Sequence, residues 1–243
     1  MINKIHPFKL RLLIAVAATI LFVPFLGGLH LFDWDEINFA EAAREMIVTG
    51  NYLTVQIDFQ PFWEKPPLFI WLQVLSMKLF GINEFAARFP NAVCGIFTLV
   101  TLFSIGRKMR DNLFGVLWTL AYAGAILPFF YFKSGIIDPW FNLFIFLGVY
   151  FLMLYAFNEN PHKVRNVALS AVFTGLAVLT KGPVGFLLVA LTGGVFLLVM
   201  RFRVKVRVQD VLVFFAVLAL VGGSWFILQI INGNYDTVKE FIV

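Results

Sequence analysis

The sequence predicts an all-α, polytopic membrane protein, and three observations lead to this fold class. Hydrophobic residues make up 60% of the 243-residue chain and charged residues only 14%, whereas soluble domains have about half apolar and about a quarter charged residues. The mean hydropathy is +0.87. Several apolar windows of about 20 residues are each long enough to cross a bilayer core of about 30 Å as a helix. Cys94, which lies in one of these windows, is the single cysteine of the chain, so an internal disulfide is excluded.

Seven membrane spans are expected, separated by short polar or basic segments. The first apolar run is longer than the core of a signal peptide and is followed by no small-residue cleavage site, so we expect it to remain in the protein. The fifth and sixth spans are divided only by Lys181, Gly182 and Pro183, a turn signal. The expected spans are residues 10–32, 87–106, 113–132, 138–157, 165–180, 184–200 and 209–231.

The placement of Lys and Arg predicts the orientation of these spans. If the N-terminus is cytoplasmic, most of the 19 Lys and Arg residues fall in short inner segments, as the positive-inside rule requires. These inner segments are residues 1–11, 107–111, 158–165 and 201–208. The net charge of +5 therefore reflects membrane orientation and indicates no nucleic-acid partner. The outer side receives the long loop 33–86 and the turns that carry Asp138 and Lys181, so ionisable groups converge there.

The outer loop opens with a predicted amphipathic helix, "DWDEINFAEAAREMIVTG", residues 33–50. Asp33 and Glu36 fit a capping box, in which carboxylates accept backbone N–H groups at the start of a helix. Glu41 and Arg44 are spaced to form an ion pair on one helical face. Apolar residues recur at helical spacing: Ile37, Ala40, Ala43 and Ile47. Gly50 is a plausible end of the helix. Such a helix is expected to lie along the membrane interface.

A second helix is predicted in the same loop, within "FWEKPPLFIWLQVLSMKLFG", residues 62–81. Pro66 and Pro67 keep the residues before them extended, and a proline is well tolerated in a first helical turn. We therefore expect a helix over about residues 67–79. Glu64 and Lys65 then lie on a stiff entry to it, where Glu64 would orient Lys65 or a cation.

Each charged residue of the outer side also has a purely structural explanation. Helix capping alone could explain Asp33, Asp35, Glu36 and Asp138. Glu64 and Lys65 could be a solvated pair, and the Lys181 side chain could extend to the lipid headgroups. The combination of these features is a more specific signal than any one of them. It consists of an Asp-Glu pair, then Glu-Lys-Pro-Pro, then a lone Asp in the second outer turn. Their order along the chain favours a shared site.

Five motifs carry a resemblance to a known family: "DWDEINFAEAAREM", "FWEKPPLFIWL", "FGINEFAARFPNAVCG", "SGIIDPWFNLF" and "LTKGPVGF". Over about residues 30–190 the chain resembles the membrane enzymes of glycosyltransferase family 39, which include protein O-mannosyltransferases and the aminoarabinose transferase of lipid A. The resemblance implies a GT-C transmembrane bundle with amphipathic juxtamembrane helices in the first outer loop. It also implies inverting transfer of a sugar from a polyprenyl-phosphate donor to a lipid or protein acceptor, at the outer face of a bacterial inner membrane.

The resemblance also implies how much of the protein this chain covers and which roles its residues have. Residues 1–243 would be the N-terminal transmembrane catalytic region of a longer protein with further spans and a soluble domain, and the ending "KEFIV" agrees with a fragment. Asp35 matches the family's candidate base, Asp138 the acidic residue of the second outer loop, and Lys65 the partner of the carrier phosphate. Topology alone makes Lys181 a second phosphate-binding candidate. Glu36 and Arg44 are expected to support the site.

Two features separate the chain from parts of the family pattern. Glu64 matches a Glu that looks like a divalent-metal ligand in some relatives, but no His is expected to pair with it. Many lipid A enzymes have Arg-Tyr where this chain has Asn38 and Phe39, which argues against an aminoarabinose donor.

Two other functions remain open from the sequence. The chain could belong to a transporter or flippase, or it could be an inactive fragment of the enzyme. Transporters place functional charges near the bilayer midplane on broken helices, whereas these charges lie in outer loops and turns. The sequence therefore favours the enzyme.

Overall fold

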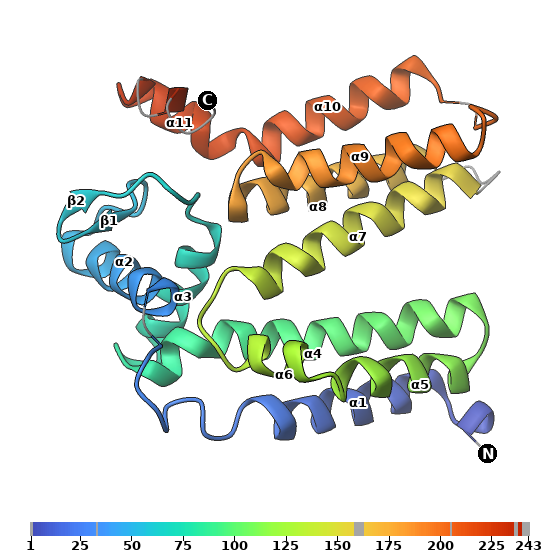
Figure 1. The fold of residues 1–243 in the computed structure, drawn as a ribbon, viewed down its shortest axis with the longest axis horizontal. Helices are drawn as coiled ribbons and strands as arrows, with labels where there is room; N and C mark the ends of the chain where they lie inside the picture. Colours follow the sequence, from blue (N-terminus) through green and yellow to red (C-terminus); the bar gives the residue numbers. More distant parts are fainter. Residues whose placement is uncertain (1, 33, 158–162, 205, 236–237, 240–243) are drawn as a thin grey trace. The chain divides into compact units, whose positions relative to one another are not determined.

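The computed structural model describes residues 2–32, 34–157, 163–204, 206–235 and 238–239. These residues are mostly helical, with one small hairpin of two strands (Figure 1). The chain divides into two compact units: Met1–Thr49 with Ile70–Pro139, and Gly50–Phe69 with Trp140–Val243.

The first unit is built around its longest helix. Its elements are η1 (Ile2–Lys4), α1 (Pro7–Phe22), α2 (Asp35–Thr49), most of α3 (Leu68–Phe80), α4 (Glu84–Met109), α5 (Asn112–Ala123) and α6 (Ile126–Phe132). Helix α4 packs against α1 on one side and α5 on another. The rings of Phe22 and Phe132 meet edge to face, with centroids 5.0 Å apart, and both side chains are buried.

The first expected span, residues 10–32, is wrong in its second half. Helix α1 ends at Phe22, and the chain then turns. Pro24 cannot continue the helical hydrogen bonding, and Phe25 adopts a left-handed conformation with φ of 62°. At 1.5 Å per residue, the 16 residues of α1 reach about 24 Å.

The third expected span, residues 113–132, is bent where the sequence predicts a continuous helix. Helices α5 and α6 meet at an angle of 76°. Pro128 lies near the start of α6, where its ring would clash with the carbonyl of the residue four positions earlier in an unbroken helix. The break at Gly124 and Ala125 avoids this clash.

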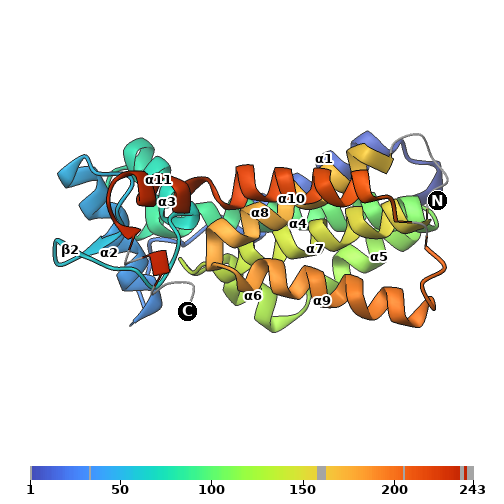
Figure 2. The ribbon, with the colours of Figure 1, turned by 90° about the horizontal axis from the view of Figure 1, so that it is seen from above.

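The second unit combines a small hairpin with a group of apolar helices. Its elements are β1 (Gln56–Ile57), β2 (Gln60–Pro61), α7 (Asp138–Phe157), α8 (Lys163–Lys181), α9 (Val184–Val199), α10 (Val208–Gly222) and α11 (Ser224–Ile231), with α7 starting at the end of the first unit. Helix α8 lies against both α9 and α10 (Figures 1 and 2). The expected span 209–231 is likewise bent, by 56° between α10 and α11. No sequence signal indicated the hairpin, whose turn residues Asp58 and Phe59 both have positive φ, as in a type I′ turn.

The two predicted helices of the outer loop are present. Helix α2 covers Asp35–Thr49 and helix α3 covers Leu68–Phe80, each within two residues of the expected bounds. Gly50 follows α2 with φ of 70°, the left-handed conformation expected of a Gly stop. The proposed cap by Asp33 lies outside the described residues.

Membrane-spanning length is met by several helices of the described part. Helices α4, α7 and α8 are long and apolar enough to cross a bilayer, and the two bent pairs raise this number to five. Helices α1 and α9 have 16 residues each and fall short of the usual length of about 20. The count of seven spans therefore remains a prediction.

Candidate functional site

The two ends of the first unit are distinct. At one end the N-terminal segment is tied to the start of α5: Asn112 donates to the carbonyl of Ile5 (3.0 Å), and the amide of Leu113 donates to Asn3 (2.9 Å). Helix α4 runs from this end to the other, and its 26 residues reach about 39 Å. Helix α2 is held at the far end through Glu36, which pairs with Arg88 of α4. The outer-loop helix and the N-terminal segment therefore lie at opposite ends of this unit, as the predicted topology requires.

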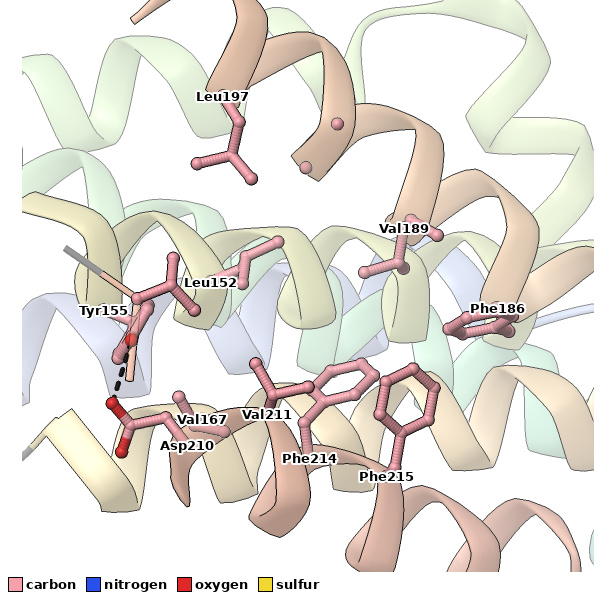
Figure 3. Close-up of a pocket in the computed structure, with 14 residues that line it drawn as sticks. Leu152, Tyr155, Val167, Phe186, Val189, Leu197, Asp210, Val211, Phe214 and Phe215 are labelled. Carbon is pink, nitrogen blue, oxygen red and sulfur yellow. Dashed lines mark hydrogen bonds between the residues drawn. The ribbon is translucent and has the colours of Figure 1, made fainter. Parts of the chain in front are cut away.

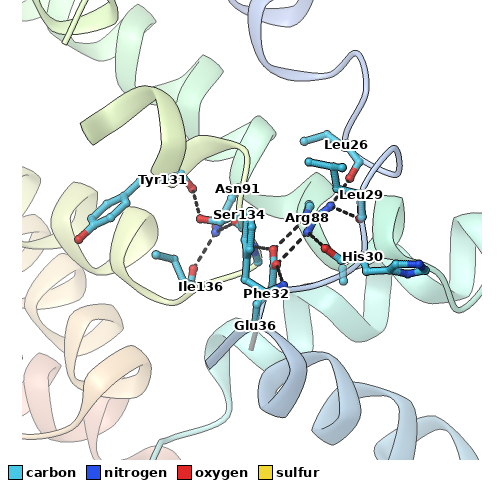
Figure 4. Close-up of polar contacts among 12 residues, drawn as sticks. Leu26, Leu29, His30, Phe32, Glu36, Arg88, Asn91, Tyr131, Ser134 and Ile136 are labelled. Carbon is cyan, nitrogen blue, oxygen red and sulfur yellow. Dashed lines mark hydrogen bonds and ion pairs between the residues drawn. The ribbon is translucent and has the colours of Figure 1, made fainter. Parts of the chain in front are cut away.

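A buried ion pair between Glu36 and Arg88 organises this far end (Figure 4). The side chains are 1% and 3% exposed, and Nε and Nη2 of Arg88 donate to the two carboxylate oxygens at 2.8 and 2.9 Å. The guanidinium also donates to three carbonyls, those of Leu26, Leu29 and His30. All five N–H groups of the guanidinium are thus used. The link after α1 is fixed to α4 by this one side chain.

The carboxylate of Glu36 is equally well satisfied. Besides Arg88, it accepts hydrogen bonds from the backbone amides of Phe32 (2.6 Å) and Gly135. Glu36 therefore joins three chain segments: the link before α2, helix α4 and the α6–α7 loop. Its contact with the Phe32 amide agrees with the expectation that Glu36 accepts backbone N–H groups near the start of α2, and its other contacts position the loops around it.

The α6–α7 loop is held by a second side chain of α4. Asn91 donates to the carbonyls of Ser134 and Ile136, at 2.6 and 2.7 Å. Gly135, between them, lies so close to α4 that an added Cβ would be 3.1 Å from the carbonyl oxygen of Ala87. This loop leads directly to Asp138, the half-buried first residue of α7. Asn91 and Glu36 therefore fix the segment that presents Asp138.

Asp35 occupies a different environment from the adjacent Glu36. It is the first residue of α2, is exposed, and has no side-chain hydrogen bond or ion pair with the described residues. Arg44, expected to support the site, forms the ion pair with Glu41 that their spacing predicts, at 2.5 and 2.8 Å. The hydrogen bonds from Arg44 hold the pKa of Glu41 below its usual value.

The hairpin segment of the second unit is anchored to α11. Nε1 of Trp225 and Nε2 of Gln229 both donate to the carbonyl oxygen of Leu53, at 2.8 and 2.7 Å. The ring of Trp63 lies 6.3 Å from that of Trp225. These contacts fix both ends of the hairpin region against one helix, immediately before Glu64 and Lys65.

Lys181 and the segment that follows Lys65 reach the same apolar cluster of the second unit. Leu68, three residues after Lys65, packs against the cluster that Phe141 and Ala177 form with Phe144. The ammonium of Lys181 lies over the Phe141 ring, 5.4 Å from its centroid. Gly182 follows with φ of 83° and forms the predicted turn. Lys181 and the segment that carries Lys65 are thus brought to one end of this helix group.

Glu64 and Lys65 are not an ion pair. Glu64 is exposed and Lys65 half-buried, and neither forms a hydrogen bond or ion pair with another described residue. Among the described residues, no three His, Cys, Asp or Glu side chains gather in a way that could hold a metal ion. A divalent-metal role for Glu64 stays a prediction.

The sequence missed four positioning residues: Arg88, Asn91, Trp225 and Gln229. Arg88 carried a usable signal, since a charge at the start of an apolar span requires a partner. The polar side chains of Asn91 and Gln229, 0% exposed in apolar helices, carried the same signal. Their partners are backbone groups in distant loops, which no local pattern reveals.

Comparison with known proteins agrees with this arrangement. Residues 64–227 match the family described as dolichyl-phosphate-mannose-protein mannosyltransferase. An uncharacterized protein of Aquifex aeolicus (strain VF5) is 30% identical over 243 residues, covering 96% of this chain and 46% of that protein. The undecaprenyl phosphate-alpha-4-amino-4-deoxy-L-arabinose arabinosyl transferase 2 of Proteus mirabilis (strain HI4320) is 26% identical over 160 residues, covering 65% of this chain and 29% of the relative.

Solved structures show the same architecture. ArnT from Cupriavidus metallidurans, in its crystal structure bound to undecaprenyl phosphate, matches with a TM-score of 0.81 at 23% identity, over 93% of this chain and 42% of ArnT. The apo state of ArnT matches with a TM-score of 0.85 at 22% identity, over 97% and 44%. The expected all-α, polytopic GT-C fold is thereby confirmed. The chain spans half or less of the length of each of these relatives.

Proposed function

The chain belongs to the dolichyl-phosphate-mannose-protein mannosyltransferase family, and on that premise we propose that it is an integral-membrane glycosyltransferase. It moves a sugar from a polyprenyl-phosphate donor to a lipid or protein acceptor, with inversion, at the outer face of the membrane. The observation that carries the proposal is that Lys181 and Leu68, three residues after Lys65, both lie against the cluster around Phe141. Two cations near one apolar surface suit a phosphate on a hydrocarbon tail.

Lys65 and Lys181 bind the donor phosphate in this proposal. As the bond between the anomeric carbon and the phosphate oxygen breaks, negative charge grows on the phosphate, and fixed ammonium groups stabilise it where water is scarce. Lys65 has no competing partner among the described residues, so its ammonium is available to the anion. That ArnT binds undecaprenyl phosphate supports a carrier of this class.

Asp35 is the proposed base for the acceptor. An exposed carboxylate that has no other partner in the described part of the chain can accept a proton from an acceptor hydroxyl as its oxygen attacks the anomeric carbon. Attack opposite the departing phosphate inverts the configuration at that carbon. Asp138 is proposed to assist, since the contacts of Asn91 and Glu36 hold the loop that precedes it.

The outer location follows from the parity of the expected spans. In the first unit, Asp35 lies at the end of α4 opposite the N-terminal segment. A cytoplasmic N-terminus, favoured by the basic segments, then places Asp35 outside. The chain has Asn38 and Phe39 where many lipid A enzymes have Arg-Tyr, so the proposal names no particular sugar or acceptor.

Paired binding and transfer assays test the proposal. Undecaprenyl phosphate binding to the full chain in nanodiscs should weaken about tenfold or more for Lys65→Gln and Lys181→Gln, because each removes a charge-assisted contact. Lys78→Gln, on the exposed end of α3, serves as the matched control and should bind as the wild type does. Unchanged affinity in both site variants would refute the donor site.

Transfer is measured separately from binding. Asp35→Asn should lower sugar transfer by about 100-fold or more, the usual contribution of a general base, while carrier binding and membrane insertion persist. Transfer at the wild-type rate by Asp35→Asn would remove Asp35 from the chemistry. A loss of binding alongside transfer would point to misfolding or to a donor contact.

A further inference from the structure

An apolar cavity of about 320 Å³ lies among α7, α8, α9 and α10 of the second unit (Figure 3). Leu152, Val189, Leu197 and Phe214 line it, and at Gly193 and Gly194 helix α9 presents no side chain to it. Its volume is in the range of about 300–1,000 Å³ that small-molecule sites occupy. A cavity with such a lining on membrane-embedded helices suits a hydrocarbon chain.

One end of this cavity is polar. The Tyr155 hydroxyl donates to the Asp210 carboxylate at 2.9 Å, and both side chains are at least 96% buried. The ammonium of Lys163 lies 5.8 Å from the centroid of the Tyr155 ring. Arg207 precedes Asp210 by one turn and is the N-cap residue of α10. An ionisable residue held inside a membrane bundle is by default a functional candidate.

The polar end is also strongly basic. Asp210 is the carboxylate that lines the cavity, whereas the chain segments that flank this end carry five described cations: Lys163, Arg165, Arg201, Arg203 and Arg207. Basic pockets between transmembrane helices on the cytoplasmic side bind the headgroups of anionic lipids. The predicted topology places this end on the cytoplasmic side, so the charge complements an anionic lipid of the inner leaflet.

We propose that this cavity is a binding site for an anionic phospholipid, with one acyl chain in the cavity and the headgroup phosphate at Lys163 and Arg207. The site is distinct from the proposed donor site. Helix α8 runs from Lys163 to Lys181, and its 19 residues separate the two phosphate positions by about 27 Å. The lipid therefore stabilises the packing of α7 to α10 and takes no part in transfer, so this site does not depend on the proposed function.

Native mass spectrometry of the full chain tests the site. The protein is released from nanodiscs that contain equal amounts of phosphatidylglycerol and phosphatidylethanolamine with identical acyl chains. The wild type should retain phosphatidylglycerol about tenfold more than phosphatidylethanolamine, because two cations contact the anionic headgroup. The variant Lys163→Gln/Arg207→Gln should lose this preference. Arg107→Gln/Arg110→Gln, which changes two cations of the first unit, should keep it.

A second variant addresses the acyl chain. Gly194→Phe places a ring in the cavity, and an added Cβ at Gly194 meets no atom within 4 Å, so the helix itself is not strained. Lipid retention should fall about tenfold, as expected when a site is filled. Val195→Phe, at a 59% exposed position of the same helix, should retain lipid as the wild type does.

Three results would overturn the proposal. Equal retention of the two lipids by the wild type would exclude recognition of the anionic headgroup. Wild-type retention by Gly194→Phe would place the acyl chain elsewhere. Displacement of phosphatidylglycerol by an equal amount of undecaprenyl phosphate would assign the cavity to the carrier tail.

Discussion

Replacing Glu36 by Gln tests the central contact of the first unit, because it removes the charge and keeps the shape. Four N–H groups point at the carboxylate, two from Arg88 and one each from Phe32 and Gly135. The amide of Gln offers one oxygen with two lone pairs, so two of these donors lose their acceptor and face an NH₂ group. Arg88, 3% exposed, is left as a buried charge without its counter-charge. Breaking a buried pair in this way costs about 3–5 kcal/mol.

The free energy of unfolding in mixed micelles gives the measurement. Glu41→Gln is the matched control on the same helix, since its partner Arg44 is 34% exposed and such pairs contribute about 0–1 kcal/mol. The pKa of Glu41 is lowered by Arg44, so the control pair stabilises the protein above the unfolded-state pKa and loses its effect as the pH falls through the folded-state pKa. If Glu36→Gln destabilises no more than Glu41→Gln, the pair does not hold this end together.

Three further predictions follow from the packing. Asn91→Ala leaves two loop carbonyls without their donor, so hydrogen exchange in the α6–α7 loop should accelerate, with a stability loss of about 1–3 kcal/mol. Gly175→Leu should lower the free energy of unfolding by about 1–3 kcal/mol, because a Cβ there would be 2.8 Å from the backbone of α10. Trp225→Phe/Gln229→Leu removes both donors to Leu53, so hydrogen exchange in the hairpin should rise while either single variant keeps one donor.

The positions of most helices could be predicted from composition and turn signals. The expected span 138–157 coincides with α7, because Pro139 stands at its first turn and a polar segment follows it. The bends at α5–α6 and α10–α11 were missed, since a Gly or Pro inside an apolar run is compatible with either a straight or a bent helix. The hairpin was missed because strands of two residues carry no periodic signal.

The candidate site was predicted unevenly. The locations of Asp35 and Asp138 at helix starts follow from local signals, and the structure has both there. The pairing of Glu36 with Arg88 was missed because Arg88 lies 52 residues away. Helical spacing and capping rules describe neighbours within a few residues, so they cannot identify a contact of this range.

The pairing of Glu36 separates the two carboxylates of the Asp-Glu motif. Glu36 accepts four hydrogen bonds and is paired with Arg88, so its carboxylate is committed to holding three chain segments together. Asp35, one residue earlier and exposed, bears no such constraint. Adjacent residues of a helix point in directions about 100° apart, so the same helix that buries Glu36 must direct Asp35 elsewhere. The motif thus divides into a structural and an available carboxylate, and only substitution of the latter should affect transfer without affecting stability.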